Sequence, residues 1–352
     1  GPEDLAYDEN GKPARIDKGF TWENPMSSHG LMHTVIANCH AGDPYKIDTL
    51  FLYMANMAWN SSMNTEETME KLTEKDANTG EYKIPKIIYS DSYYSETVAF
   101  ADLILPDTTY LERYDCISLL DRPIGEPDQV SDAIRWPVVK PDRDVRSFQD
   151  VLLQLGALLE LPGMVDDDKK PLFKDYSDYM QKHQRRPGIG PLAGYRGDNN
   201  LESGRGDSSP NQIEKYVKNG GFWSEKIPEN AQYYKPWNEA YQKWAVKKGF
   251  FDKEEPFVFQ IYLEPLAKLQ NHQGLPSNLK PQKHLHKRIE EKMDPLPIWW
   301  PNHDQEKLEQ YPIHAITQRP AAMYHSWGSQ NVWLRQIHGS NKLFLSESLW
   351  KA

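Results

Sequence analysis

Polar side chains follow two apolar segments of this sequence, at the point where each segment ends. Asn56 and Asn60 follow the first segment, and Asp91 and Ser92 follow the second. Carboxylates and amides at the ends of buried strands can accept hydrogen bonds from a ribose hydroxyl or from the N–H edge of a base. The same residue types also cap helices and pin loops. The sequence therefore allows two interpretations, a site for a polar ligand or a set of structural hydrogen bonds.

A second candidate region is the polar and aromatic stretch 317–335, which has no helical or strand periodicity. Arg319 and Arg335 can contact phosphate, and His325 can donate a hydrogen bond to a polar ring system. A loop of this kind is costly to order without a ligand or a partner. The alternative is a packed loop at a junction between domains.

Other reactive residue types form no complete motif. His33, Cys39 and His40 lie close together, but a second pair at zinc-finger spacing is missing, so a packed cysteine is the preferred interpretation. His284 and His286 lie among basic residues, which favours a solvated face over a metal site. With two cysteines, the chain cannot form a disulfide scaffold, a four-cysteine zinc site or its own iron–sulfur cluster.

Composition limits the class of protein. The chain has 352 residues, of which 38% are hydrophobic and 26% charged, so it predicts a folded core in one large or two smaller domains. The net charge is −10 without a long basic block, which excludes nucleic acid as an expected partner. No apolar run reaches the ~18 residues that a membrane-spanning helix needs. The start at Gly1-Pro2 carries no signal segment, so we expect a processed start or a piece of a longer protein.

The two apolar segments, 47–54 and 86–90, are typical of parallel strands that helices cover on both sides. The elements between and after them are predicted to be a helix from an N-cap at Thr65 to about Lys75, a short helix over 95–100 and a third strand over 102–106. This order predicts an α/β fold with a parallel sheet built from a right-handed βαβ series. Ligands in such sheets bind at the carboxyl ends of the strands.

The remaining segments are less regular. A helix with apolar residues at helical spacing is predicted over 148–161, where Pro162-Gly163 ends it. The Gly-rich stretch 188–206 predicts no regular structure. Further helices are predicted over 211–219 and 237–248, and strands over 257–262 and 311–317.

Segment 91–106, with the sequence DSYYSETVAFADLILP, is followed by Glu112-Arg113. It is similar to the D-x-x-x-T-E-T-x-x-x-A-D-x-x-L-P … E signature of molybdopterin oxidoreductase catalytic subunits, the dimethyl-sulfoxide-reductase superfamily. Segment 47–56 resembles the strand of that family that ends in Asn-Pro, with Met57 in place of proline. Segment 317–331 resembles the opening of the family's carboxyl-terminal cap domain, with Gln318 in place of the common glycine.

The resemblance implies that this chain binds one arm of a molybdopterin guanine dinucleotide cofactor that carries molybdenum. Asp91 matches the acidic residue near the nucleotide end, Thr97 and Asp102 match residues that brace the loop, and Arg319 and His325 match residues that contact the pterin. The implied cofactor-binding residues are Asn56, Asn60, Asp91, Ser92, Thr97, Asp102, Thr317, Arg319, His325 and Asn331. No catalytic residue and no ligand to the metal is implied within this chain.

The resemblance also implies an organisation of the chain. The expected regions are an irregular approach segment (1–46), an α/β cofactor-binding domain (47–163), an insertion and connecting region (164–305) and the start of a β-rich cap domain (306–352). Because the chain matches less than half of the family, we expect an internal or carboxyl-terminal part that is inactive by itself. A [4Fe-4S] cluster is expected in an amino-terminal part outside this chain.

Run 330–335 and the long insertion are similar to the three-subunit branch that acts on sulfite, thiosulfate or polysulfide, and sulfite oxidation is the favoured reaction. The implied partners are an iron–sulfur electron-transfer subunit, a membrane-anchor subunit and a small inorganic or organic substrate. The implied location is the cytoplasmic side of a membrane-associated complex, or alternatively the periplasm. Two other interpretations remain, a protein like the large subunit of respiratory complex I that binds no molybdenum, and an aromatic-rich binding protein for sugars or peptides.

Overall fold

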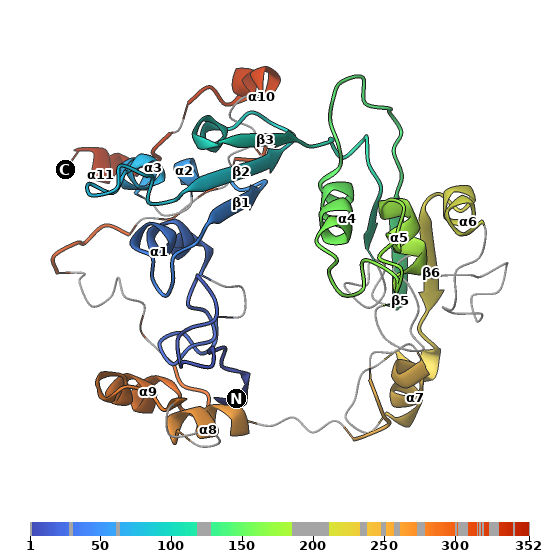
Figure 1. Cartoon of the computed structure of the whole chain (residues 1–352). Coiled ribbons are helices and arrows are strands. Elements are labelled where there is room, and N and C mark those ends of the chain that lie inside the picture. The colour runs from blue at the N-terminus through green and yellow to red at the C-terminus, as the bar shows by residue number, and fades with distance from the viewer. Residues whose placement is uncertain are drawn as a thin grey trace. The chain divides into compact units, whose positions relative to one another are not determined.

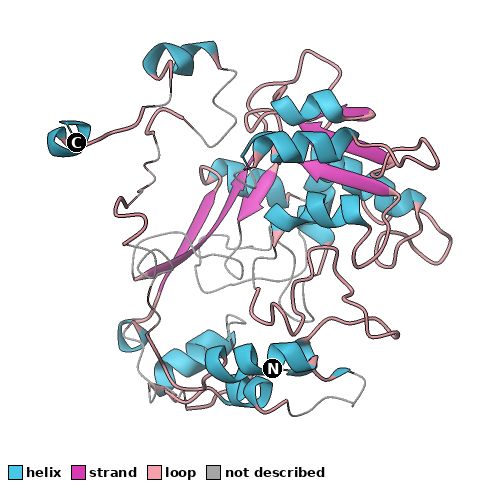
Figure 2. Cartoon of the chain, turned by 90° about the vertical axis from the view of Figure 1, so that its left-hand side faces the viewer, coloured by secondary structure: helices cyan, strands magenta, loops and turns pink. Residues whose placement is uncertain are grey.

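The computed structural model divides the chain into two compact units, one formed by residues 1–104 and 260–352 and the other by residues 105–259. The residues that the structure describes are 2–27, 31–60, 64–117, 128–184, 211–232, 238–247, 251–256, 261–272, 279–299, 301, 309–314, 316, 318, 320–323, 331–340 and 342–351. The strands gather into two three-stranded sheets (Figure 2).

The sheet of the first unit has the order β1-β2-β3, formed by β1 (Thr49–Tyr53), β2 (Lys86–Asp91) and β3 (Leu103–Pro106). β1 and β2 are parallel, and α3 (Thr65–Thr73) lies between them in the sequence (Figure 1). The predicted α/β class and the predicted pair of apolar strands are therefore confirmed.

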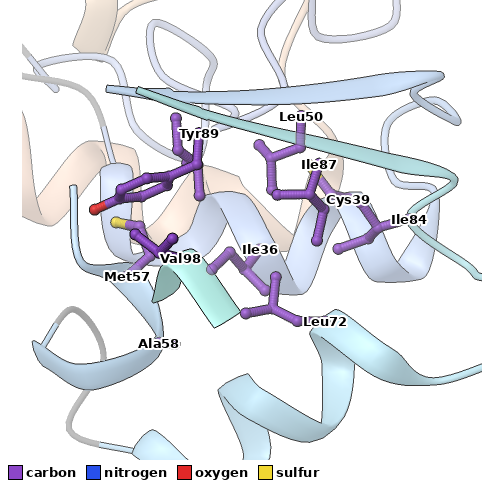
Figure 3. Close-up of a cluster of buried hydrophobic side chains, with 11 residues drawn as sticks. Ile36, Cys39, Leu50, Met57, Ala58, Leu72, Ile84, Ile87, Tyr89 and Val98 are labelled. Atoms are coloured by element: carbon purple, nitrogen blue, oxygen red, sulfur yellow. The ribbon is translucent and has the colours of Figure 1, made fainter. Parts of the chain in front are cut away.

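The core of this unit lies where helices pack against the sheet. Leu50 and Leu52 of β1 and Ile87 and Tyr89 of β2 are buried, while the side chains between them are half-buried. Figure 3 shows Leu50, Ile87 and Tyr89 facing side chains of the helices. The covering elements are α1 (Val35–Ala41), α2 (Met57–Asn60), α3 and the 3₁₀ helix η3 (Glu96–Phe100), which contribute Ile36, Cys39, Met57, Ala58, Leu72 and Val98.

The beginning of α3 differs from the prediction by one residue. The N-cap is Asn64, whose side-chain oxygen accepts a hydrogen bond from the backbone N–H of Glu67 at 3.3 Å. Asn and Thr are both suitable N-cap residues, so the residue types alone did not show which of the two adjacent positions, 64 or 65, is the N-cap. The helix ends at Thr73, two residues earlier than predicted.

The amino-terminal segment is part of a second core in this unit, although the sequence predicts only an irregular approach segment. Trp22 is buried and packs with Leu269, Leu285 and Ile289. Its indole Nε1 donates a hydrogen bond to the carbonyl oxygen of Leu279 at 2.5 Å. The partner residues lie on or beside α8 (Glu264–Gln270), the 3₁₀ helix η6 (Lys283–Leu285) and α9 (His286–Lys292).

The second unit contains an antiparallel sheet that the sequence analysis did not predict. Its order is β4-β5-β6, formed by β4 (Asp115–Ile117), β5 (Gln129–Arg135) and β6 (Phe222–Lys226). β5 is paired on both sides, and one of its partners comes from far along the chain. The unit's core is formed by Ile134, Met180, Tyr216, Ala231, Trp244 and Ala245.

Helices surround this core and agree with most of the predicted helices. The predicted helices over 211–219 and 237–248 correspond to α6 (Gln212–Lys218) and α7 (Glu239–Lys247). A helix that was not predicted, α5 (Tyr176–Lys182), begins at the N-cap Asp175.

Helix α4 (Phe148–Leu158) confirms the predicted helix, although it ends before the predicted end at 161. Leu152, Leu155 and Leu158 are exposed to 44%, 37% and 75%, and Gly156 is the buried residue of this helix. Apolar residues at helical spacing are typical of a helix that packs one face against a core. Apolar spacing predicted the helix, since spacing depends on local sequence, but it did not predict what covers it.

The predicted strand over 311–317 is wrong for the residues that can be compared. Residues 311–314 and 316 form no strand, and Ile313 and Ile316 are exposed to 60% and 89%. From residue 309 onward, the described part contains α10 (Val332–Ile337) and α11 (Glu347–Lys351) but no strand, so the predicted β-rich character is not found there. Residues 188–206 and 257–260 lie outside the described residues.

No helix among the described residues is both long and apolar enough to cross a bilayer.

His272 lies at the second core of the first unit, with a backbone φ of 55°. Its ring meets Trp22 edge-on with centroids 5.7 Å apart and lies 4.7 Å from the ring of His286. Burial is the main cause that lowers the pKa of His272 below 6.5; the charges of His286 and Lys280 act in the same direction, and that of Glu290 acts against them.

We expect acid to weaken this packing. Because the pKa of His272 is lowered in the folded state, the unfolded chain binds the proton more readily, and stability falls as the pH drops below about 6.5. His272→Asn removes the titrating group and keeps a residue that tolerates positive φ. Thermal melts between about pH 8 and pH 5 should show a steeper loss for the unaltered chain than for this variant. Equal slopes would contradict the assignment to His272.

Candidate functional site

The carboxyl ends of β1 and β2 lie side by side. Tyr53 is opposite Ser90 in the parallel register, and the N–H of Met54 donates to the carbonyl oxygen of Ser90 at 3.0 Å. Asn56 follows the first strand end, and Asp91 is the last residue of β2. The structure therefore brings Asn56 and Asp91 to one edge of the sheet.

Asn56 and Thr97 are bonded to each other at this edge. The side-chain oxygen of Asn56 accepts from the Thr97 N–H at 3.1 Å and from the Thr97 hydroxyl at 2.7 Å. The Asn56 amide donates to a carboxylate oxygen of Glu96 at 2.6 Å. The Ala58 N–H donates to the Thr97 hydroxyl at 2.9 Å. These bonds join the loop after β1 to η3, and Asn56 and Thr97 are only 2% and 0% exposed.

Asp91 is also held by the protein. Its carboxylate accepts from the Tyr89 hydroxyl and from the Tyr93 N–H, both at 3.0 Å, and the residue is 6% exposed. The Tyr89 hydroxyl lies 2.9 Å from that of Ser95. Burial is the main cause that raises the pKa of Tyr89, and the charge of Asp91 adds to it, while the Ser95 hydrogen bond acts against it. Tyr89 therefore remains a neutral hydrogen-bond donor toward Asp91.

Asp102 lies at the other end of β2. Its carboxylate accepts from the Ile87 N–H at 2.7 Å, and its own N–H donates to the Ile87 carbonyl oxygen at 2.8 Å. At ~3.3 Å per residue along a strand, Ile87 and Asp91 are about 13 Å apart. Asp102 thus braces the chain before β3, and the structure does not bring it to the edge with Asp91.

The remaining predicted residues have various outcomes. Ser92 is half-buried beside Asp91. Asn331 is the N-cap of α10, where its side-chain oxygen accepts from the N–H groups of Trp333 and Leu334 at 3.0 Å and 3.2 Å. The side chain of Asn60 and the whole of Thr317, Arg319 and His325 lie outside the described residues.

Three exposed aromatic residues at this edge were missed by the sequence analysis. Trp59 of α2 is 51% exposed, and Tyr93 and Tyr94 after β2 are 43% and 69% exposed. The sequence does contain a signal that could have identified them, because aromatic residues occur in both polar loops that follow the two neighbouring strands. The buried hydroxyl of Ser90, at the end of β2, has no hydrogen-bond partner among the described residues.

The signature continues into the second unit, where its last residues form ion pairs. Glu112 accepts two hydrogen bonds from the Arg143 guanidinium, both at 2.8 Å. This pairing is the main cause that holds the pKa of Glu112 at about 2. Arg113 is buried and pairs with the buried Asp107 at 2.6 Å. These ion pairs lie within the second unit and stabilise it.

The described cysteine and histidine side chains give no support for a metal site. Cys39 is 2% exposed, and burial raises the pKa of its thiol to about 11, so the predicted packed cysteine is confirmed. His40 lies 2.7 Å from a carboxylate oxygen of Glu74. Among the described residues, no group of three or more His, Cys, Asp or Glu side chains is arranged to hold a metal ion.

Two open clefts occur in the second unit, with volumes of about 700 Å³ and about 290 Å³. They share Arg146, Asp150 and Asp175 as lining residues. Asp175 accepts from the Asp178 N–H as the N-cap of α5, and Asp150 accepts from the Tyr176 N–H. Both carboxylates therefore hold the local structure beside these clefts.

Comparison with known proteins adds one relative. No protein-family model matches the chain. The chain is similar to a sulfite dehydrogenase subunit from Allochromatium vinosum, with 46% identity over 350 residues, or 98% of this chain. The chain spans 36% of the length of that relative, so the similarity concerns about a third of it.

Thr97→Val tests how much the network at the strand edge depends on one hydroxyl. The variant keeps the shape but removes a donor to Asn56 and an acceptor for the Ala58 N–H. Leaving buried polar groups unpaired costs about 1–3 kcal/mol, so we expect a loss of stability of that size in urea unfolding. Thr97→Ser keeps the hydroxyl and should lose less. An unchanged stability of Thr97→Val would show that the network does not depend on this hydroxyl.

Proposed function

We propose that this chain is part of the catalytic subunit of a molybdenum oxidoreductase, and that the edge formed by β1 and β2 binds the nucleotide arm of a molybdopterin guanine dinucleotide. The observation that carries the proposal is the convergence of Asn56, Thr97 and Asp91 at the carboxyl ends of two parallel strands. Open α/β sheets bind ligands at this edge.

The residues at the edge fit a nucleotide. The carboxylates of Asp91 and Glu96 are acceptors, which suit ribose hydroxyls and the N–H groups of guanine. The hydroxyl of Ser90, which has no hydrogen-bond partner among the described residues, is a further polar group at the same strand end. Among the described residues no ligand to molybdenum is assigned. When bound, the cofactor would supply two-electron or oxygen-atom transfer, while the side chains of this chain hold and orient its nucleotide arm.

For the reaction, we propose oxidation of sulfite. The support is the name of the relative, which is a sulfite dehydrogenase subunit, at 46% identity. That name also supports a multi-subunit assembly, in which we propose an iron–sulfur electron-transfer subunit and a membrane-anchor subunit as partners. The [4Fe-4S] cluster would lie in a part of the polypeptide outside these residues. We propose the cytoplasmic side of the membrane as the location, with the periplasm as the alternative.

A second candidate is a protein with this fold but no molybdenum, as in the large subunit of respiratory complex I. The specific observation in its favour is that Asn56 and Thr97 are buried and bonded within the protein, so the edge is held together without a cofactor. Elemental analysis for molybdenum and fluorescence of the extracted pterin decide between the two. A folded protein that contains neither would overturn the molybdenum proposal.

Asp91→Ala should lower the cofactor content of the purified protein, because it removes an acceptor at the predicted nucleotide end. The measurement is the amount of molybdenum and of released GMP per polypeptide. The matched control is Asp48→Ala, an exposed carboxylate that precedes β1 at the opposite end of the same sheet. We expect a several-fold loss with the first variant and no loss with the second. Unchanged content in Asp91→Ala would show that Asp91 only holds Tyr89 and the Tyr93 backbone.

A further inference from the structure

Helix α4 packs against its own unit along one side. Gly156 is its buried residue, and the chain lies so close there that a Cβ would be 2.9 Å from the Cγ atom of Met164. Asp150 accepts a hydrogen bond from the Tyr176 N–H at 2.7 Å and so connects the helix to α5. At about 100° per residue, Gly156 and Asp150 lie on the same half of the helix. The opposite half faces away from both contacts.

That opposite half carries a row of leucines. Leu152, Leu155 and Leu159 follow one another at i, i+3 and i+7, and Leu158 lies beside them. In chain order these four side chains are 44%, 37%, 75% and 60% exposed. Single exposed leucines are common on protein surfaces, but several on one face of one helix are typical of an interaction site. We call these four residues the leucine face.

A cleft of about 700 Å³ borders the leucine face. Leu158 belongs to both, and Phe173 adds an apolar wall to the cleft. Arg146 and Lys174 are also in the lining. Within the described part of the chain, the Arg146 guanidinium bonds to the neutral amide of Gln154, and the Lys174 ammonium has no ion pair. Both cations are therefore available to carboxylates that come from elsewhere.

The other charged groups of the cleft are already engaged. Asp150 and Asp175 each accept a hydrogen bond from a backbone N–H group near the start of a helix. Lys169 is paired with Glu160 at 2.8 Å. The surface thus combines an apolar helix face with two cations at its border. A helix with an apolar face and with Asp or Glu along one flank is complementary to such a surface.

The comparison with the known relative indicates where such a helix would come from. The relative matches 98% of this chain at 46% identity, yet the chain spans only 36% of it. The larger part of that subunit therefore lies outside the matched residues. A well-ordered helix that exposes four leucines in the matched part is a natural place for the larger part to pack.

We propose that the leucine face and the adjoining cleft dock an amphipathic helix with an acidic flank, which belongs to the same subunit outside these 352 residues. The helix would lay its apolar residues over Leu152, Leu155 and Leu159 and its carboxylates beside Arg146 and Lys174. This inference rests on one premise of the proposed function, that the chain is part of a longer catalytic subunit, and it concerns the second unit rather than the cofactor.

The first test measures how fast a water-soluble maleimide labels a cysteine on the leucine face of the complete purified subunit. Leu155→Cys reports on this face. Val217→Cys, on α6, is the matched control because both side chains are apolar, helical and 37% exposed. We expect position 155 to react at least roughly tenfold more slowly than position 217, since covering one leucine shifts an open–closed equilibrium by that factor or more. Mass spectrometry of the two peptides measures both rates.

Two outcomes of this test would overturn the proposal. Equal rates at positions 155 and 217 would show that nothing covers the leucine face in the complete subunit. Protection of position 155 that disappears on dilution would assign the face to a second copy of the subunit. Protection that is independent of concentration supports a segment of the same polypeptide.

A second test addresses the acidic flank. Lys174→Glu, combined with Leu155→Cys, should raise the labelling rate at position 155 several-fold, because it places a carboxylate beside the carboxylates of the docked helix. Lys170→Glu is the control, since this exposed lysine is close in sequence, is paired with Asp168 and does not line the cleft. Equal rates in the two variants would contradict the acidic flank. Neither readout depends on molybdenum, so failure here leaves the cofactor content to decide the proposed function.

Discussion

The pair of hydrogen bonds between Asn56 and Thr97 is the interaction on which the strand edge depends. The two residues are 41 positions apart in the sequence, and both are buried. Their bonds connect the loop that follows β1 with the 3₁₀ helix that follows β2, so each loop fixes the other. A buried amide without partners would cost about 1–3 kcal/mol. The position of Glu96, and of the aromatic residues next to these bonds, follows from this pairing.

The same bonds hold this strand edge in place through residues that are buried within the protein. A side chain with its groups bonded inside the protein gives rigidity to the backbone around it, while exposed neighbours remain available for contact. In this chain Asn56 and Thr97 are of the first kind, and Trp59 and Tyr94 are of the second. An edge of this construction is preorganised, which lowers the entropy that a ligand loses on binding.

Each unit contains its own sheet, and the strands of the two sheets differ in how clearly the neighbouring sequence predicts them. Segments 47–54 and 86–90 of the parallel sheet are continuous apolar runs, in which buried side chains alternate with half-buried ones. Strand β5 contains polar residues such as Ser131 and Asp132, and it is stabilised by pairing with β4 on one side and β6 on the other. Because β6 begins at Phe222, no local window of sequence contains both members of that pair.

The sequence by itself determined the parallel strands, the helices with clear apolar spacing and the polar residue types at the strand ends, because these depend on residues close together in the chain. Only the tertiary structure decided which partners those polar residues have: Thr97 for Asn56, Tyr89 for Asp91, and Ile87 for Asp102. It also decided that the amino-terminal segment packs through Trp22 against α8 and α9, and that Leu152, Leu155 and Leu158 of α4 are exposed. Such outcomes depend on contacts between distant residues, which neither spacing nor composition specifies.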